Sequence, residues 1–127
     1  MSAKIVIVDD DPTNTELAKM LLEFEGFEVV TAATLAVAHD VAAPDVNAFI
    51  IDHHLARGEK GIDLLQDIRA GKTDAPFDCV SIVSSGDSRS EMDAIAAGAT
   101  LFLSKPYSIE ILVTHLRELL AKGGTRG

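Results

Sequence analysis

Cysteine and positive charge are both scarce in this chain, and no long apolar run occurs in it. The lone cysteine, Cys79, lies in an apolar run and is predicted to be a reduced core residue, which suits the cytosol. A formal net charge of −9 without a basic patch argues against direct binding to nucleic acid or to an anionic membrane. No stretch approaches transmembrane length, and the N-terminus lacks a signal-peptide core. We therefore expect a soluble cytoplasmic protein.

The composition is that of one ordinary globular domain. Of the 127 residues, 47% are hydrophobic and 24% are charged. We find no internal repeat, low-complexity tract or linker. Residues 1–122 are predicted to form the domain, and the glycine-containing residues 123–127 a flexible tail. We expect the domain to stand alone, unless the tail begins a linker to a missing part.

Short apolar runs alternate five times with segments of helical periodicity, which predicts a parallel α/β sheet covered by helices on both faces. The predicted strands are Ile5–Val8, Phe27–Thr31, Ala48–Ile51, Val80–Val83 and Leu101–Leu103. The predicted helices are Pro12–Glu25, Leu35–Ala43, Gly61–Ala70, Arg89–Ala97 and Ile109–Lys122. The first helix is expected to be capped by Asp11 and to bury one apolar face, made of Leu17, Met20, Leu21 and Phe24.

Two acidic residues follow the first predicted strand without an obvious structural role. Asp9 and Asp10 come directly after Val8, and only the third acid, Asp11, is explained as a helix cap. Like charges about 4 Å apart repel by roughly 4 kcal/mol at an effective dielectric near 20. A hard divalent cation is the leading candidate to offset that repulsion. We therefore expect the functional site of the protein to lie at Asp9 and Asp10.

Polar residues also follow the other central strands. Asp52 follows the third strand, Ser84 and Ser85 follow the apolar run of the fourth, and Lys105 follows the fifth. In an open parallel sheet, the carboxyl ends of the strands meet at one edge, where ligands bind. Carboxylates, a hydroxyl and a lysine at one edge predict a site for a divalent cation and a phosphoryl group.

These motifs, in this order and spacing, resemble the receiver domain of two-component response regulators from Lys4 to Lys122. The matching elements are Asp9-Asp10, Asp52, Ser84-Ser85, Gly98-Ala99 and Lys105-Pro106-Tyr107. The resemblance implies a doubly wound (βα)5, flavodoxin-like fold with strand order 2-1-3-4-5. It also implies a signalling domain that becomes a phosphoprotein. Such a domain is not an enzyme, although it would catalyse its own phosphotransfer and autodephosphorylation.

The resemblance assigns a role to each site residue. Asp52 would be the phosphoacceptor, attacking as a carboxylate nucleophile and forming an aspartyl phosphate. Ser84 would hydrogen-bond the acyl phosphate, and Lys105 would pair with it. Mg²⁺, or Mn²⁺ in its place, would be held by Asp9, Asp10, Asp52 and the backbone carbonyl of His54.

The resemblance further implies a switch and its partners. Phe102 occupies the aromatic switch position, and its ring would swing inward once Ser84 is drawn to the phosphate. The phosphoryl donor would be a histidine kinase or a histidine phosphotransfer protein. Output would pass through the fourth helix, fifth strand and fifth helix to an unidentified partner, with the domain monomeric or dimerising on phosphorylation.

The loop after Asp52 departs from the family pattern. Ala56 stands where a proline is common, and the nearest glycines are Gly58 and Gly61, six and nine residues after Asp52. The loop 57–60 is therefore expected to be one residue longer and more flexible than usual.

Other functions fit fewer residues. Asp9-Asp10-Asp11-Pro12-Thr13 matches the start of a haloacid-dehalogenase-type phosphohydrolase, in which Asp9 would be the nucleophile and Asp11 the general acid. That reading leaves Asp52 without a role and lacks an acidic metal motif beyond Lys105. A receiver-like interaction module that works without phosphorylation stays open. Flavin binding is disfavoured because the first loop lacks a phosphate cradle and its acids would repel phosphate.

Overall fold

Five parallel strands form one sheet in the order β2-β1-β3-β4-β5, which confirms the predicted fold class and strand order. The computed structural model describes residues 2–125, with side chains described as far as residue 122. The strands are Lys4–Val8 (β1), Glu28–Ala32 (β2), Val46–Asp52 (β3), Val80–Ser85 (β4) and Leu101–Ser104 (β5). The helices are Pro12–Phe24 (α1), Leu35–Val41 (α2), Gly61–Arg69 (α3), Ser90–Ala96 (α4) and Ile109–Thr125 (α5), with a 3₁₀ turn at Ala56–Gly58 (η1).

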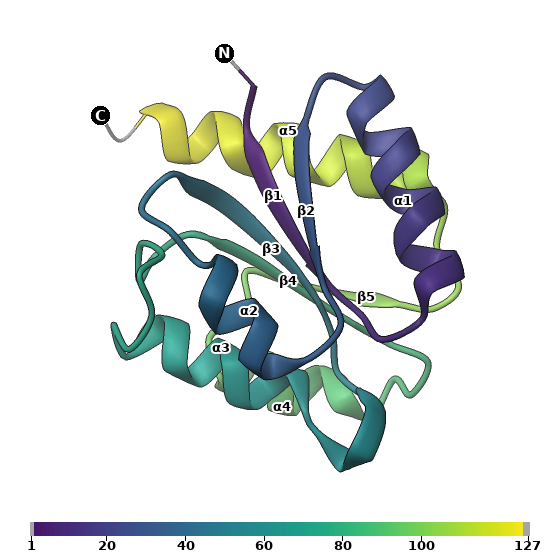
Figure 1. Cartoon of the computed structure of the whole chain (residues 1–127), viewed down its shortest axis with the longest axis vertical. Coiled ribbons are helices and arrows are strands. Elements are labelled where there is room, and N and C mark those ends of the chain that lie inside the picture. The colour runs from purple at the N-terminus through teal and green to yellow at the C-terminus, as the bar shows by residue number, and fades with distance from the viewer. Residues whose placement is uncertain (1, 126–127) are drawn as a thin grey trace.

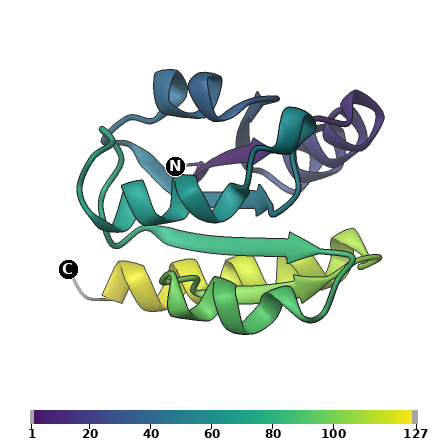
Figure 2. The same cartoon turned by 90° about the horizontal axis from the view of Figure 1, so that it is seen from below.

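The sheet is buried on both faces, as continuous β-branched strands predict. In β1, Ile5 and Ile7 pack into the core beneath α1 and α5, whereas Val6 and Val8 pack into the core beneath α2, α3 and α4. Figure 1 shows these two groups of helices on opposite sides of the sheet. In Figure 2 the sheet lies between α3 and α5, and its arrowheads point the same way. The carboxyl ends of the strands therefore share one edge.

The predicted elements all occur, and their ends move by a few residues. Strand β3 begins two residues earlier than predicted, at Val46, and β4 continues two residues further, to Ser85. Helix α5 continues through Thr125, past the predicted domain end at residue 122, and residues 126–127 lie outside the described part of the chain. The boundary and the flexible tail stay predictions. None of the helices in residues 2–125 is long and apolar enough to cross a bilayer.

The buried face predicted for α1 is wrong. Three residues of α1 face the sheet: Thr15 and Leu22 are buried, and Ala18 packs against the core. The predicted apolar stripe is exposed instead, with Phe24 at 87% exposure. The stripe consists of Leu17, Met20, Leu21 and Phe24. Thr15, Ala18 and Leu22 are spaced three and four residues apart and form the face of α1 that packs on the sheet, so the predicted stripe lies beside that face and not on it.

Arg69, at the end of α3, ties together three segments near the amino end of β4. Its guanidinium donates hydrogen bonds of 2.8 Å to the carbonyls of Gly98, Phe77 and Cys79, and one of 3.3 Å to the Thr100 hydroxyl. The fork of the guanidinium supplies several donors in fixed directions, which a single ammonium cannot reproduce. Arg69 thus anchors the turn that follows α4.

We expect Arg69→Lys to lower the free energy of unfolding by about 1.5–3 kcal/mol, because charge-assisted hydrogen bonds to backbone carbonyls are lost. Urea denaturation measures this change. The matched control is Arg117→Lys, because Arg117 makes one exposed ion pair with Glu25 at 3.0 Å and one hydrogen bond to a backbone carbonyl, that of Glu25 at 3.1 Å, against three for Arg69. Exposed pairs contribute under about 1 kcal/mol. Equal losses in the two variants would contradict the anchoring role of Arg69.

Candidate functional site

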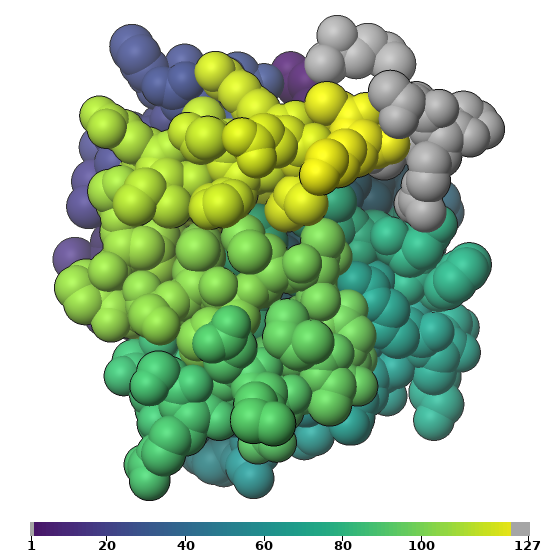
Figure 3. Space-filling model, turned by 180° about the vertical axis from the view of Figure 1, so that it is seen from behind, coloured from purple at the N-terminus to yellow at the C-terminus, as the bar shows by residue number. Residues whose placement is uncertain are grey.

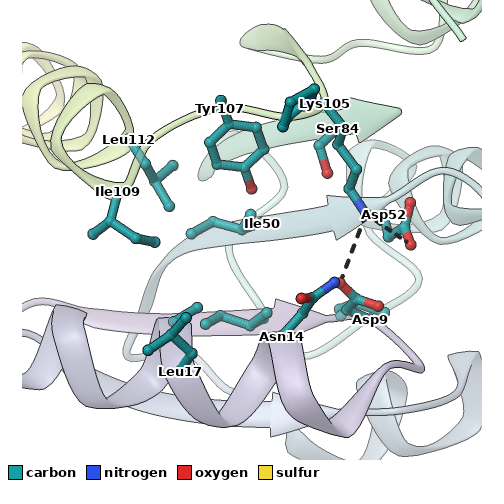
Figure 4. A pocket seen from close by; sticks show the side chains of 14 residues that line it. Asp9, Asn14, Leu17, Ile50, Asp52, Ser84, Lys105, Tyr107, Ile109 and Leu112 are labelled. Atoms are coloured by element: carbon teal, nitrogen blue, oxygen red, sulfur yellow. Dashed lines mark ion pairs between the residues drawn. The ribbon is translucent and has the colours of Figure 1, made fainter. Parts of the chain in front are cut away.

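The carboxyl ends of β1, β3, β4 and β5 bring the candidate site residues together. Asp52 lies beside Ser84 in the β3–β4 register, and Val8, which precedes Asp9, lies beside Ile51. The backbone N–H of Lys105 donates to the Ser85 carbonyl at 2.8 Å, which holds the start of the last loop next to β4. Figure 4 shows side chains from all four strand ends converging on one cavity.

An acidic cluster lies at the polar end of this cavity, where Asp9, Asp52 and Lys105 line it. One carboxylate oxygen from each of Asp9, Asp10 and Asp52 lies within 4.8 Å of the others. The Lys105 ammonium lies 3.2 Å from the Asp52 carboxylate and 3.8 Å from that of Asp9. The Asp52 and Asp9 side chains are only 12% and 13% exposed. Their charges are therefore poorly screened by water, and a single ammonium does not balance three carboxylates.

The electrostatics of the site follow from this burial. Burial raises the pKa of Asp9 above its usual range, against a hydrogen bond from the Asp11 N–H and the attraction of Lys105, which lower it. For Lys105, burial lowers the pKa, but the attraction of Asp52 and Asp9 outweighs it, so the net pKa is raised. Lys105 is thus held in its protonated form beside the carboxylates of Asp52 and Asp9, whose negative charge it offsets only in part.

The acidic triplet divides as the sequence predicts. The Asp11 carboxylate accepts hydrogen bonds from the N–H groups of Thr13 at 3.0 Å and Asn14 at 3.4 Å, and Pro12 begins α1. Asp11 is thereby the helix cap and turns away from the cluster. That arrangement does not suit a general acid paired with an Asp9 nucleophile, as the phosphohydrolase reading requires.

The two serines at the end of β4 differ in what their hydroxyls contact. The Ser85 hydroxyl accepts a hydrogen bond from the Asp87 N–H at 3.0 Å and contacts the Ser90 hydroxyl at 3.5 Å, so it shapes the loop into α4. Ser84 instead lines the cavity with Asp52 and Lys105. Of the two serines, Ser84 is therefore the one whose side chain lines the cavity beside Asp52.

The loop after Asp52 is folded into a closed turn rather than left open. His54 pairs with Lys60, the Leu55 N–H donates to the Glu59 carbonyl at 3.0 Å, and the Gly61 N–H donates to the His53 carbonyl at 2.9 Å. The carbonyl of His54 takes no part in these hydrogen bonds. The backbone N–H of His54 donates to the Asp52 carboxylate at 3.4 Å.

Gly61 has a role that sequence reasoning missed. A Cβ atom at this position would collide with the backbone carbonyl of Asp52 and the side chain of Ile51. The start of α3 can therefore pack against the end of β3 only because residue 61 has no side chain. In the sequence, the only sign of this role was that Gly61 stands nine residues after Asp52, whereas the receiver pattern commonly has a glycine eight residues after the acceptor.

The predicted switch residue and a second aromatic residue occupy opposite sides of the sheet. Phe102 is already inside, 9% exposed, in the core beneath α2, α3 and α4. The inward movement of its ring stays a prediction, and this structure shows the inner position. Tyr107 packs on the other core and lines the cavity, a placement that sequence reasoning did not foresee.

The cavity itself measures about 280 Å³ and has two unlike ends. Asp9, Asp52, Ser84 and Lys105 line the polar end. Apolar side chains from the sheet, α1 and α5 line the other end, including Ile7, Leu17, Ile50, Ile109 and Leu112.

A comparison with known families decides the identity. Residues 5–117 match the family model described as "Response regulator receiver domain". The chain belongs to the response-regulator receiver family. This confirms the predicted resemblance, and receiver domains of this family act in two-component signalling, bind Mg²⁺ at an acidic pocket and interact with histidine kinases and output partners.

Individual relatives agree with this assignment. Response regulator MprA of Mycobacterium tuberculosis is 32% identical over 124 residues, covering 96% of this chain and 52% of that protein. The phosphate regulon transcriptional regulatory protein PhoB of Pseudomonas aeruginosa is 25% identical over 120 residues, covering 94% and 52%. The chain thus spans about half the length of these curated relatives. A CheY-like receiver domain from Methanospirillum hungatei superimposes with a TM-score of 0.87 at 27% identity, with 100% of both chains covered.

Proposed function

We propose that this domain accepts a phosphoryl group from a phosphohistidine onto Asp52 in a Mg²⁺-dependent reaction. The observation that carries the proposal is the position of the Asp52 carboxylate, 3.2 Å from the Lys105 ammonium and within 4.8 Å of the Asp9 and Asp10 oxygens. A carboxylate that accepts an anionic group needs positive charge nearby to offset the repulsion, and one lysine beside three carboxylates does not provide enough.

The chemistry is the transfer of one phosphoryl group between two side chains. An Asp52 oxygen forms a bond to phosphorus while the phosphorus–nitrogen bond to the donor imidazole breaks, and the electron pair returns to the imidazole nitrogen. Lys105, held protonated by its acidic neighbours, pairs with the phosphoryl oxygens. The Ser84 hydroxyl lines the same cavity and donates a hydrogen bond to the acyl phosphate.

The acidic cluster suits the metal that the reaction requires. Carboxylate oxygens of Asp9, Asp10 and Asp52 are hard ligands, and a hexacoordinate Mg²⁺ keeps several waters in addition to a few protein oxygens. Mn²⁺ would accept the same oxygen donors. When bound, the metal neutralises the developing charge on the transferred group. The carbonyl of His54 would complete the protein ligands.

We expect Asp10→Ala to weaken Mg²⁺ binding by tenfold or more, because one of the three carboxylates in the cluster is removed. Titration with Mg²⁺, followed by amide chemical shifts, measures the dissociation constant. The control is Asp45→Ala, because Asp45 pairs with Lys4 at 3.3 Å at the opposite edge of the sheet. An unchanged Mg²⁺ titration in Asp10→Ala would refute the role of Asp10 as a ligand.

Mg²⁺ affinity should also depend on pH in a way set by Asp9. Because burial raises the pKa of Asp9, its protonated form persists at higher pH than an ordinary carboxyl, and that form must lose its proton to bind metal. Affinity is therefore constant well above the raised pKa and falls as pH decreases through it. Mg²⁺ titrations at about pH 7 and about pH 5 compare the two regimes, and a steeper loss is expected for wild type than for Asp9→Asn.

The surface expected to signal phosphorylation lies at the β5 edge of the sheet, where α4 and α5 flank that strand. Figure 3 shows α4, β5 and α5 side by side on one face of the molecule. Three apolar side chains are exposed on its two helices, namely Met92 at 82%, Ile95 at 49% and Ile111 at 48%. We propose that an output partner binds this α4–β5–α5 surface, because large apolar side chains exposed on its helices favour protein contacts.

Beryllofluoride, a mimic of the phosphoryl group, tests the proposed function. With Mg²⁺ present, we expect the backbone amide resonances of Asp52, Ser84 and Lys105 to shift, and those of α4 and β5 to follow. The variant Asp52→Asn should show none of these shifts. A wild-type spectrum that stays unchanged around Asp52 would instead favour an interaction module that works without phosphorylation.

A further inference from the structure

The loop between β3 and α3 closes through a turn that has little packing of its own. The Leu55 N–H donates to the Glu59 carbonyl at 3.0 Å, and the Glu59 N–H donates to the Ala56 carbonyl at 3.3 Å. Inside the turn, Arg57 has a φ of 62°, in the left-handed region that residues with a side chain rarely adopt. Ala56, Arg57 and Gly58 are all exposed. The closed turn therefore needs support from another part of the fold.

The side chain of Glu59 supplies that support from α2. Its carboxylate accepts a hydrogen bond of 3.1 Å from the backbone N–H of Leu35, the first residue of α2, and the contact is partly buried. An N–H in the first turn has no partner within its own helix, and the positive end of the helix favours a carboxylate. The Thr34 hydroxyl caps the Val37 N–H instead, at 3.1 Å, which leaves the Leu35 N–H to Glu59.

The other end of the same loop meets the Asp52 carboxylate. The His54 N–H donates to that carboxylate at 3.4 Å, and His54 pairs with Lys60 across the base of the loop. Lys60 follows Glu59 directly in the chain. A displacement of Glu59 would therefore move His54 relative to Asp52, and with it the His54 carbonyl that we propose as a metal ligand.

We propose that Glu59 is a positioning residue whose hydrogen bond to α2 holds the loop so that His54 stays beside Asp52. The inference rests on the proposed binding of Mg²⁺ at Asp52, because the His54 carbonyl serves the reaction only when a metal is bound there. Glu59 acts through the backbone of the turn, since Leu35 engages its carboxylate. The contact restrains a loop that its length and its glycine predict to be flexible.

Three variants isolate this hydrogen bond. Glu59→Ala removes the acceptor, whereas Glu59→Gln removes the charge but keeps an oxygen that accepts from Leu35. Leu35→Pro removes the donor, because proline lacks the N–H and is favoured at the first position of a helix. The preceding residue, Thr34, already has the extended backbone that a following proline requires, with φ −137° and ψ 164°.

Hydrogen exchange of the metal-free protein measures the order of the loop. The reporters are the amides of Leu55 and Gly61, which donate to the carbonyls of Glu59 and His53. We expect Glu59→Ala to exchange these two amides roughly three- to tenfold faster than wild type, as the loss of one hydrogen bond allows. Glu59→Gln should exchange them at nearly the wild-type rate. Unchanged exchange in Glu59→Ala would overturn the inference.

Mg²⁺ titration followed by amide chemical shifts measures the effect on the site. We expect Glu59→Ala to bind Mg²⁺ roughly two- to tenfold more weakly, because a loop that opens part of the time presents the His54 carbonyl only when closed. Glu59→Gln should bind with nearly the wild-type affinity. In the Leu35→Pro background, Glu59→Ala should have no further effect, because the hydrogen bond is already absent.

The outcomes separate this inference from the function it rests on. If Mg²⁺ leaves the Asp52 amide of the wild-type protein unshifted, the proposed metal binding is overturned and the inference falls with it. If wild type and Glu59→Ala bind Mg²⁺ equally well, Glu59 is merely structural and only the inference is overturned. Equal weakening in Glu59→Ala and Glu59→Gln would also overturn it, since the lost charge alone would then explain the result. Additive effects of Glu59→Ala and Leu35→Pro would do the same, because one shared hydrogen bond is lost only once.

Discussion

Asp52→Asn is expected to abolish phosphorylation by a cognate histidine kinase or by acetyl phosphate. The asparagine amide has nearly the shape of the carboxylate but no anionic oxygen, so it cannot form the acyl phosphate. The fold should survive, because the amide still fits beside Ser84 in the β3–β4 register. Autoradiography of the protein after incubation with labelled donor and Mg²⁺ measures the loss.

The matched control for this variant is Asp11→Asn. Asp11 caps α1 and turns away from the cluster, and asparagine is as good a helix cap as aspartate. We therefore expect Asp11→Asn to be phosphorylated at the wild-type rate. Labelling of Asp52→Asn to the wild-type level would refute the assignment of Asp52, and loss of labelling in Asp11→Asn would refute the division of the acidic triplet.

Gly61→Ala should damage both the fold and the site through one methyl group. The added Cβ collides with the Asp52 carbonyl and the Ile51 side chain, so either the end of β3 or the start of α3 must move. We expect a loss of about 1–3 kcal/mol in the free energy of unfolding, typical of overpacking. A displacement of Asp52 by about 1 Å would slow phosphorylation by on the order of 100-fold.

Gly86→Ala is the control for the added methyl group. Gly86 lies in the loop after β4, close in sequence to Ser84, but a Cβ there meets nothing within 4 Å. We expect its free energy of unfolding to stay within about 0.5 kcal/mol of wild type. Urea denaturation and a phosphorylation time course compare the two variants, and equal behaviour would contradict the close approach of Gly61 to Asp52.

The sequence predicted the order of elements and the edge of the sheet that holds the site, because both depend on patterns of few residues. Buried parallel strands read as short β-branched runs, and the residues after them, such as Asp9, Asp52 and Lys105, must share one edge. The sequence also predicted that Asp11 differs in role from Asp10, since a proline after Asp11 marks it as a helix cap.

The sequence failed where packing against another element decides the outcome. Periodicity placed an apolar stripe on α1 but could not say that Thr15 and Leu22, and not Phe24, face the sheet. The same limit hid the close approach of Gly61 and the placement of Tyr107 at the cavity. Each depends on how two distant segments meet, which no local pattern encodes.

The most direct test of the central claim is to map the phosphorylated residue. The chain is phosphorylated in the presence of Mg²⁺, the acyl phosphate is trapped by chemical reduction, and the modified peptide is identified by mass spectrometry. We predict a single modification at Asp52, beside the Lys105 ammonium. Modification at Asp9 would contradict the account and favour the phosphohydrolase chemistry whose sequence motif Asp9-Asp10-Asp11 matches.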